Sequence, residues 1–347
     1  MTTTLPAARR ASAPGRAWTR AVPAFAVALA LLLLGSLVSL AVGSNPIALE
    51  RVWTILWHPD GSFESVVVLE QRLPRTLLLI VVGAALGVAG ALIQSLTRNP
   101  LADPGILGIN AGASLAVVLA VAITGVASIG FYLWFAFAGA AASAVAVYLL
   151  GMAGRADASP VRLALAGVAI SMLVASLVQT VILANQNAFN EFRFWAAGSV
   201  EGRGFAVLAT VVGFIGLGLI LSFCLAPALN TLALGEETGR ALGVRVGLVR
   251  GLAVVAVTVL AGSATAASGP IMFIGLGVPY LARAVLGPDQ RLVLPGTAVA
   301  APVLLLAADV LARLVVMPAE VPVGVVAAII GGPMFVAIVR RPRIEAL

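Results

Sequence analysis

Three ionisable side chains stand close together in the stretch LALGEETGRALGV, residues 232–244. They are Glu236, Glu237 and Arg240, and long apolar runs lie on both sides of them. Glu236 and Arg240 are four residues apart, so on a helix they can form an ion pair in the favourable orientation. The apolar side chains of the stretch fall on the opposite side of the helical wheel. The pattern predicts a short amphipathic helix, which is either a solvated loop helix or a docking helix for another protein.

A second pair with helical spacing is Asp309 and Arg313, at the end of another apolar run. An ion pair on one helix face would account for both residues.

Several kinds of functional site are excluded because the chain lacks the residues that they need. The single histidine, His58, rules out an H-E-x-x-H zinc site, and a chain without lysine cannot form a P-loop. Cys224 lies in an apolar run, where a packing role is expected. No metal-ligand cluster falls within the spans.

The elements that must position these groups are membrane-spanning helices. The chain is 61% hydrophobic and 10% charged, with a mean hydropathy of +1.10 and apolar runs of about 20 residues. These runs do not alternate as barrel strands would, so the fold class is an all-α polytopic membrane protein. We predict ten spans, near residues 21–42, 76–97, 111–127, 130–151, 162–184, 205–226, 246–267, 270–286, 292–314 and 322–339.

Charge sidedness orients these spans. With both termini in the cytoplasm, fifteen of the arginines lie inside and six outside, as the positive-inside rule requires. Residues 1–20 form a basic cytoplasmic tail, and residues 21–340 form the ten-helix domain. Its two halves, about 21–184 and 205–340, would be inverted relative to each other because each has an odd number of spans. The net charge of +7 is therefore explained by arginines on the cytoplasmic side of the membrane and does not indicate nucleic-acid binding.

Small residues and helix-breaking residues indicate where the spans pack closely and where they are interrupted. GAALGVAGAL (residues 83–92) and GAAASAVAVYLLG (139–151) read as packing faces. Proline and glycine interrupt the apolar pattern at 99–112, within 268–296 and within 306–333. Such interruptions are typical of broken helices near transport paths.

Six stretches of the chain resemble motifs of the permease subunits of the FecCD family, and they occur in the same order as in that family. These permeases belong to ABC importers of iron–siderophores, and the vitamin B12 and haem permeases are their relatives. The resemblance covers about residues 46–340, and one departure is Tyr280, where many members carry histidine. The stretches are RLPRTL, NPLADPGILGINAGA, LALGEETGRALG, GPIMFIGLGVPYLAR, LLLAADVLAR and AEVPVGVVAAIIGGP.

The resemblance implies partners for both charged regions. It implies two permease subunits around a central path, as a homo- or heterodimer, with two cytoplasmic P-loop ATPases and an extracytoplasmic binding protein. Residues 230–243 would be the coupling helix that meets the ATPase, through Leu234, Gly235, Glu236, Glu237 and Arg240. The binding protein would dock on Arg72, Arg75 and Arg313. The local alternatives are pairs of Arg72 with Glu70 and of Arg313 with Asp309.

The expected function is the membrane-spanning permease of an ATP-driven importer for an iron(III)–siderophore, in the cytoplasmic membrane, with no cofactor and no ATPase activity of its own. The alternatives are cobalamin or haem import, or a secondary carrier working without ATP. Candidates for the translocation path are Gln94, Asn110 and Ser171, each of which could equally serve helix packing.

Overall fold

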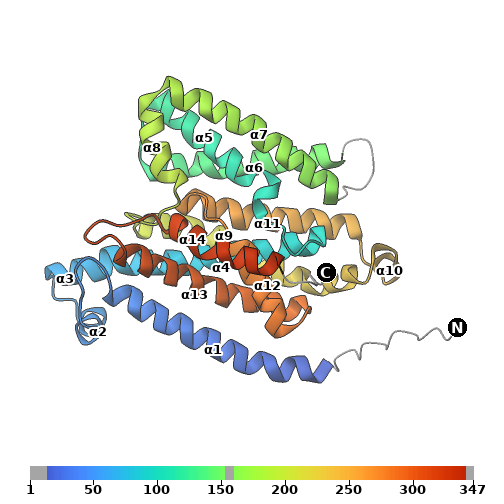
Figure 1. Cartoon of the computed structure of the whole chain (residues 1–347), viewed down its shortest axis with the longest axis horizontal. Coiled ribbons are helices and arrows are strands. Elements are labelled where there is room, and N and C mark those ends of the chain that lie inside the picture. The colour runs from blue at the N-terminus through green and yellow to red at the C-terminus, as the bar shows by residue number, and fades with distance from the viewer. Residues whose placement is uncertain (1–13, 153–159, 341–347) are drawn as a thin grey trace.

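The computed structural model describes residues 14–152 and 160–340, and these ranges are helical, with connecting turns and no strand (Figure 1). Ten apolar helices follow one another in the predicted order. The prediction of an all-helical polytopic chain is thereby confirmed. Residues 1–13 of the predicted tail, and the arginines at 155, 341 and 343, lie outside the described residues.

Seven of these helices are long and apolar enough to cross a membrane, and three are shorter. The long ones are α1 (Pro14–Ala41), α4 (Leu73–Thr97), α6 (Ile129–Met152), α7 (Pro160–Ala184), α9 (Phe205–Ala233), α11 (Val246–Ser268) and α13 (Gln290–Leu314). The shorter ones are α5 (Ile109–Thr124), α12 (Ile274–Leu286) and α14 (Val323–Val339). Each of the shorter helices adjoins one of the stretches in which proline and glycine interrupt the apolar pattern.

The remaining helical segments are short: α2 (Leu49–Trp57), α3 (Phe63–Val66), the π-helical η1 (Val67–Arg72), the 3-10 turn η2 (Pro104–Leu107), α8 (Gln186–Ala196) and α10 (Glu236–Ala241). Segments α2 and α8 lie where the sequence analysis expected connecting loops. Helix α9 continues past Pro227 to Ala233, beyond its predicted end. Helix α12 begins at Ile274 rather than 270, because Pro270 and a left-handed Phe273 (φ 68°) interrupt the backbone there.

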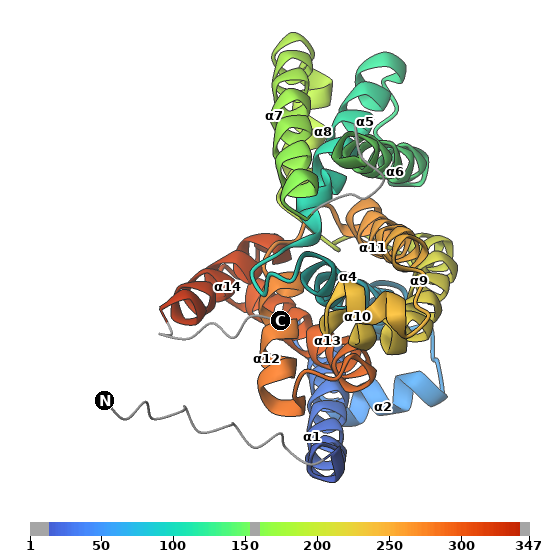
Figure 2. The same ribbon diagram turned by 90° about the vertical axis from the view of Figure 1, so that its right-hand side faces the viewer.

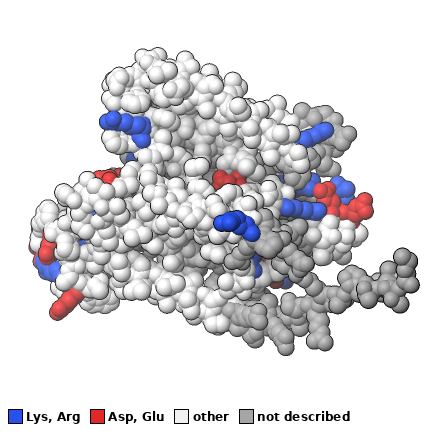
Figure 3. Space-filling model, viewed as in Figure 1, with Lys and Arg blue, Asp and Glu red and all other residues white. Residues whose placement is uncertain are grey.

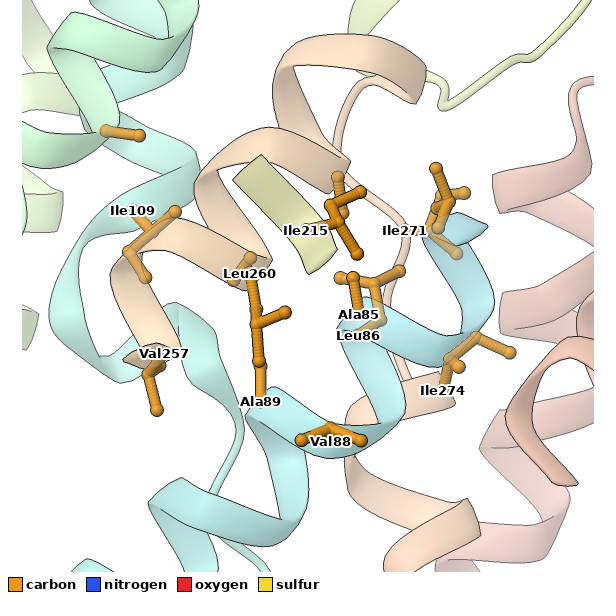
Figure 4. Close-up of a cluster of buried hydrophobic side chains, with 14 of the residues drawn as sticks. Ala85, Leu86, Val88, Ala89, Ile109, Ile215, Val257, Leu260, Ile271 and Ile274 are labelled. Atoms are coloured by element: carbon orange, nitrogen blue, oxygen red, sulfur yellow. The ribbon is translucent and has the colours of Figure 1, made fainter. Parts of the chain in front are cut away.

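Helix α4 is the centre of the molecule and is buried along most of its length between α9, α11, α12 and α13. Its glycines allow this close packing. A Cβ on Gly90 would stand 1.7 Å from the carbonyl oxygen of Gly275, and one on Gly83 would stand 2.7 Å from the Cα of Pro302. The predicted packing role of residues 83–92 is confirmed. Buried side chains of α4 meet those of α9, α11 and α12 in one apolar core, of which Figure 4 labels Ala85, Leu86, Val88, Ala89, Ile109, Ile215, Val257, Leu260, Ile271 and Ile274.

Helices α5, α6, α7 and α8 form a second group, which packs on the central helices through α11 (Figure 2). Helices α5 and α6 approach closely, because a Cβ on Gly139 would lie 2.3 Å from the carbonyl oxygen of Gly112. The predicted halves of the chain are not separate in space. Helices α1 and α4, from the first half, pack against α13 from the second. The inverted relation of the halves stays a prediction.

The helix bundle has two ends. Helices α2, α3 and α8 lie at one end, which we call the arginine end, and α10 lies at the opposite one, the α10 end (Figure 1). Helix α1 starts and α14 finishes toward the α10 end. In Figure 3 most of the surface between these ends is uncharged, with only a few charged side chains near the middle and more toward the ends. This distribution fits a protein whose middle is surrounded by lipid. Cys224 is exposed on α9, so its expected packing role within the chain is corrected.

Candidate functional site

At the arginine end, Arg75 joins the start of α4 to two carboxylates distant in the sequence. Its Nε and Nη2 donate to Oδ1 of Asp309 at 3.0 and 2.7 Å, and its Nη1 donates to Oε2 of Glu320 at 2.6 Å. The Arg75 side chain is 11% exposed and that of Glu320 19%. Arg75 therefore ties α4 both to α13 and to the turn that precedes α14.

Arg313 shares Asp309 with Arg75. Its Nη2 donates to Asp309 Oδ2 at 2.6 Å and to Ser39 Oγ at 2.7 Å, and its Nη1 donates to the carbonyls of Ser39 and Val42 at 2.9 Å each. The i,i+4 pair of Asp309 and Arg313, expected from the sequence, is confirmed. Asp309 is fully buried and Arg313 is 2% exposed, so this carboxylate is neutralised inside the protein.

Among the residues that the structure describes, Arg72 is held by backbone carbonyls and not by a carboxylate. Its guanidinium group donates to the carbonyls of Leu40 and Ala41 at 2.8 and 2.9 Å, and to that of Asn45. The first two carbonyls end α1, where the helix dipole favours a cation. Glu70, the partner suggested by the sequence, is exposed instead. Together we call Arg72, Arg75, Arg313, Asp309 and Glu320 the arginine cluster.

The arginine cluster borders a cavity of about 500 Å³ at the arginine end, the outer cavity. All three predicted arginines line it. A fourth, Arg203, which the sequence analysis assigned no role, lines it as well. Arg203 lies in the connection between α8 and α9, where no motif marks it, so only its position on the predicted outer side could have drawn attention to it.

A smaller polar network orders the turn between α2 and α3 beside this cavity. Arg51 donates to Asp60 and, at 2.8 Å, to Glu64. Hydrogen bonds from Ser62 and then from Arg51 hold the pKa of Asp60 well below its usual range. The turn is therefore charged at neutral pH and presents Phe63 to solvent at its tip.

At the opposite end, α10 is held by contacts at its first turn. Gly235 has a φ of 117° and separates α9 from α10. Glu236 pairs with Arg250 of α11 and, at 3.8 Å, with Arg240. The predicted i,i+4 pair is confirmed, and Arg250 is the closer partner that sequence reasoning missed. Arg98 donates to the carbonyl of Leu232 at 2.9 Å, at the end of α9.

The far side of α10 is exposed and of mixed chemistry. Leu234 is 69% exposed and Leu242 64%, and Glu237 and Arg240 are exposed beside them. The helix spans Glu236–Ala241, so Leu234 and Gly235 of the predicted helix precede it. Exposed apolar side chains next to charged ones, as at this end of the bundle, are typical of a surface on which another protein docks.

The three path candidates are not brought together. Gln94 is fully buried, where its Nε2 donates to the carbonyl of Leu276 at 3.0 Å and its Oε1 accepts from Arg283. Asn110 is half-buried and its Oδ1 accepts from Thr265 at 2.9 Å. Ser171 is half-buried on α7, and Tyr280 is half-buried on α12. Gln94 thus joins α4 to α12 in this conformation. Among the described residues, no group of three His, Cys, Asp or Glu side chains could hold a metal ion.

Comparison with known proteins assigns this arrangement to a family. The model of the FecCD transport family matches residues 31–341. The chain is 44% identical to the ferric enterobactin transport system permease protein FepD of Escherichia coli (strain K12), over 90% of this chain and 93% of that protein. It is 39% identical to the Fe(3+)-citrate import system permease protein YfmD of Bacillus subtilis (strain 168), over 92% and 95% respectively.

A solved structure agrees with the fold. A metal-chelate type ABC transporter in an inward-facing conformation superposes with a TM-score of 0.80 at 27% sequence identity, covering 90% of this chain and 97% of that one. The match over nearly the whole length of both chains, together with the ten apolar helices, shows that the chain belongs to the FecCD transport family of ABC transporter permeases.

Proposed function

We propose that this multi-pass membrane permease imports an iron(III)–siderophore across the cytoplasmic membrane, by alternating access driven by ATP hydrolysis in a partner chain. The observation that carries the proposal is the pairing of a family match with two charged regions at opposite ends of the helix bundle. A binding protein would deliver the substrate at one region, and an ATPase would transmit the energy of ATP hydrolysis at the other. The arginine excess on the side of α10 supports a cytoplasmic location for that end and for both termini.

At the arginine end, the docking partner would be an extracytoplasmic binding protein. Arg72, Arg75 and Arg313 would contribute mainly through their charge, because internal acceptors already occupy most of their donors. With Arg203 they outnumber the three glutamates that line the outer cavity, so an acidic surface would be attracted to it. Attraction of this kind raises the association rate and weakens with salt.

At the α10 end, the partner would be a P-loop ATPase. Leu234, Gly235, Glu236, Glu237 and Arg240 would form the contact, and residues 230–243 would transmit ATPase closure to α9 and α11. The link is physical, because α10 is joined to α9 through Gly235 and to α11 through the Glu236–Arg250 pair. A second permease subunit would complete the path, as a homo- or heterodimer. Gln94, Asn110 and Ser171 stay candidates for path residues in other conformations.

The proposed substrate class is based mainly on the substrates named for the relatives. FepD and YfmD carry ferric enterobactin and iron(III) citrate in their names, and we extend the class to this chain. The carrier would take the intact chelate, which brings its own metal ligands. Cobalamin and haem are the alternatives within the same family.

The test is reconstitution of the permease with its ATPase in liposomes. Uptake would be measured with ferric enterobactin, iron(III) citrate, cobalamin and haem, each delivered by a binding protein from the same genomic neighbourhood. We expect ATP-dependent uptake of a ferric chelate. When the metal and the chelator carry different labels, both labels should enter together. Entry of the metal alone, preference for cobalamin or haem, or uptake independent of ATP would contradict the proposal.

A further inference from the structure

The four arginines around the outer cavity differ in how many of their donors are used inside the protein. Arg72 donates to three carbonyls, Arg75 to two carboxylates, and Arg313 to a carboxylate, a hydroxyl and two carbonyls. Arg203 donates from Nη1 to the hydroxyl of Tyr132 at 3.4 Å, and its buried Nε has no hydrogen-bond partner. A contact of 3.4 Å is a weak one. The buried Nε of Arg313 also lacks a partner, but its Nη groups make four short contacts, so Arg203 is the arginine of this cavity with the fewest and weakest internal hydrogen bonds.

The charge of Arg203 is also unmatched nearby. Glu201 and Glu320 line the same cavity, but no ion pair joins either of them to Arg203 within the described part of the chain. Glu320 is engaged by Arg75 at 2.6 Å. An incoming carboxylate would therefore supply the charge partner that Arg203 lacks among the described residues.

The backbone that carries Arg203 is anchored. The amide of Ser199 donates to the carbonyl of Ser268 at 2.8 Å, and that of Gly324 donates to the carbonyl of Gly198 at 2.9 Å. A Cβ on Gly198 would stand 2.6 Å from the carbonyl oxygen of Pro270, so the loop lies directly against its neighbours. Arg203 is thus presented from a fixed base between α8 and α9 rather than from a free loop.

Arg203 stands where two hollows adjoin. The second hollow, of about 520 Å³, is lined by residues of α6 and α8, and it shares Glu201, Gly202, Arg203 and Glu320 with the outer cavity. Arg203 is partly exposed between them. A side chain entering from the arginine end can therefore approach the Nη groups of the guanidinium group from either hollow, whereas the Nε atom is buried.

We infer that Arg203 receives a carboxylate side chain of the extracytoplasmic binding protein when that protein docks at the arginine end. The two Nη groups of a guanidinium group match the two oxygens of a carboxylate in a bidentate, charge-assisted contact. The contact would give the Nη groups a stronger acceptor than the Tyr132 hydroxyl at 3.4 Å and would neutralise the charge of Arg203 in one step. This inference rests on the proposed function, because it assumes that a binding protein delivers the substrate.

The test measures docking directly. Arg203→Glu and Arg203→Gln would be made in the assembled permease–ATPase complex, and the dissociation constant of the substrate-free binding protein would be measured at low and at high salt. We expect Arg203→Glu to weaken docking by about tenfold at low salt and by less at high salt, with Arg203→Gln intermediate. A lysine in place of the matching acidic residue of the binding protein should restore docking to Arg203→Glu.

The matched control is Arg193→Glu. Arg193 is exposed on α8 at the same end, lies over the ring of Phe194 at 4.5 Å, and is absent from the lining of both hollows. It reports the general effect of reversing one charge on this face. If Arg203→Glu weakens docking no more than Arg193→Glu does, the inference is wrong.

Two further readouts separate the possible failures. The thermal midpoint and the basal ATPase rate of Arg203→Gln show whether the complex is intact; an intact Arg203→Gln complex that docks like wild type overturns the inference. If the wild-type complex binds no binding protein at all, the proposed function fails before Arg203 is tested. A loss of uptake with normal docking would instead place the carboxylate on the substrate and also overturn the inference.

Discussion

At the arginine end, Asp309 is fully buried between two guanidinium groups, whereas at the α10 end Glu237 and Arg240 are exposed on a helix of six residues. Both regions hold acidic and basic residues in helical spacing, so the sequence alone makes them look alike. The structure separates them by what the charges touch. Charges that contact internal acceptors fix the shape of one end. Charges at the surface of the other end lie where a partner protein can contact them. The consequences of mutation should differ accordingly, with stability lost at the first end and coupling lost at the second.

The largest effect is expected from Asp309→Asn. The change keeps the volume of the side chain but leaves Arg75 and Arg313 facing a neutral amide, and removing one partner of a buried ion pair costs about 3–5 kcal/mol. We expect a large fall in the thermal midpoint of the purified protein in detergent, measured by the loss of monodisperse protein on heating. The control is Asp60→Asn in the exposed α2–α3 turn, which should leave the midpoint nearly unchanged. Equal midpoints for the two variants would show that the arginine cluster does not hold this end together.

The next effect is expected from Gly235→Val. At a φ of 117° a β-branched residue is strained, at a cost of about 1–3 kcal/mol, which would displace α10 from α9. We expect the permease to stay folded while the binding protein no longer stimulates ATP hydrolysis. Gly247→Ala is the control, because Gly247 lies in α11 with open space around it and an alanine favours the helix. Stimulation that survives Gly235→Val would remove α10 from the coupling route.

A smaller effect on stability is expected from Glu236→Gln. Glu236 and Arg250 are partly exposed, at 34% and 16%, and pairs of this kind contribute about 0–1 kcal/mol. Transport should fall further than stability does, because the pair connects α10 to α11. The measurement is ATP-driven uptake alongside the thermal midpoint, in Glu236→Gln, Arg250→Gln and the double variant. If the two single losses simply add in the double variant, the pair does not act as a unit.

The sequence predicted the apolar helices well because lipid imposes a strong and simple pattern on them. It also predicted the pairs of Asp309 with Arg313 and of Glu236 with Arg240, since both are local. It missed α2 and α8, whose 9 and 11 residues are too short and too amphipathic to produce a spanning signal. In α2, Val52 and Ile55 are buried while Trp53 and Trp57 face outward, a pattern typical of a helix at a membrane interface.

The contacts that the sequence could not show have a common physical reason. Arg72 is bound by backbone carbonyls, and every residue has a carbonyl, so no side-chain pattern marks such a partner. Arg75 and Asp309 are 234 residues apart, and only the packing of α4 on α13 brings them together. Arg203 is identified by how few internal hydrogen bonds it makes, which is a property of the folded chain alone.

The smallest effect on stability, and the sharpest contrast between the ends, is expected from Leu242→Ala. Leu242 is 64% exposed beside α10, so its truncation removes little buried contact and should change the free energy of unfolding by no more than about 0.5 kcal/mol. If α10 docks on the ATPase, the same side chain becomes buried in the complex, where losing a leucine side chain costs about 1.5–3 kcal/mol. The control is Leu217→Ala on α9, where the side chain is 67% exposed in the middle of a membrane-spanning helix. Both variants should melt like wild type, and only Leu242→Ala should lose affinity for the ATPase in a pull-down titration. Equal affinity in both variants would leave Leu242 without a role in ATPase docking, and the two ends would then differ in burial and not in function.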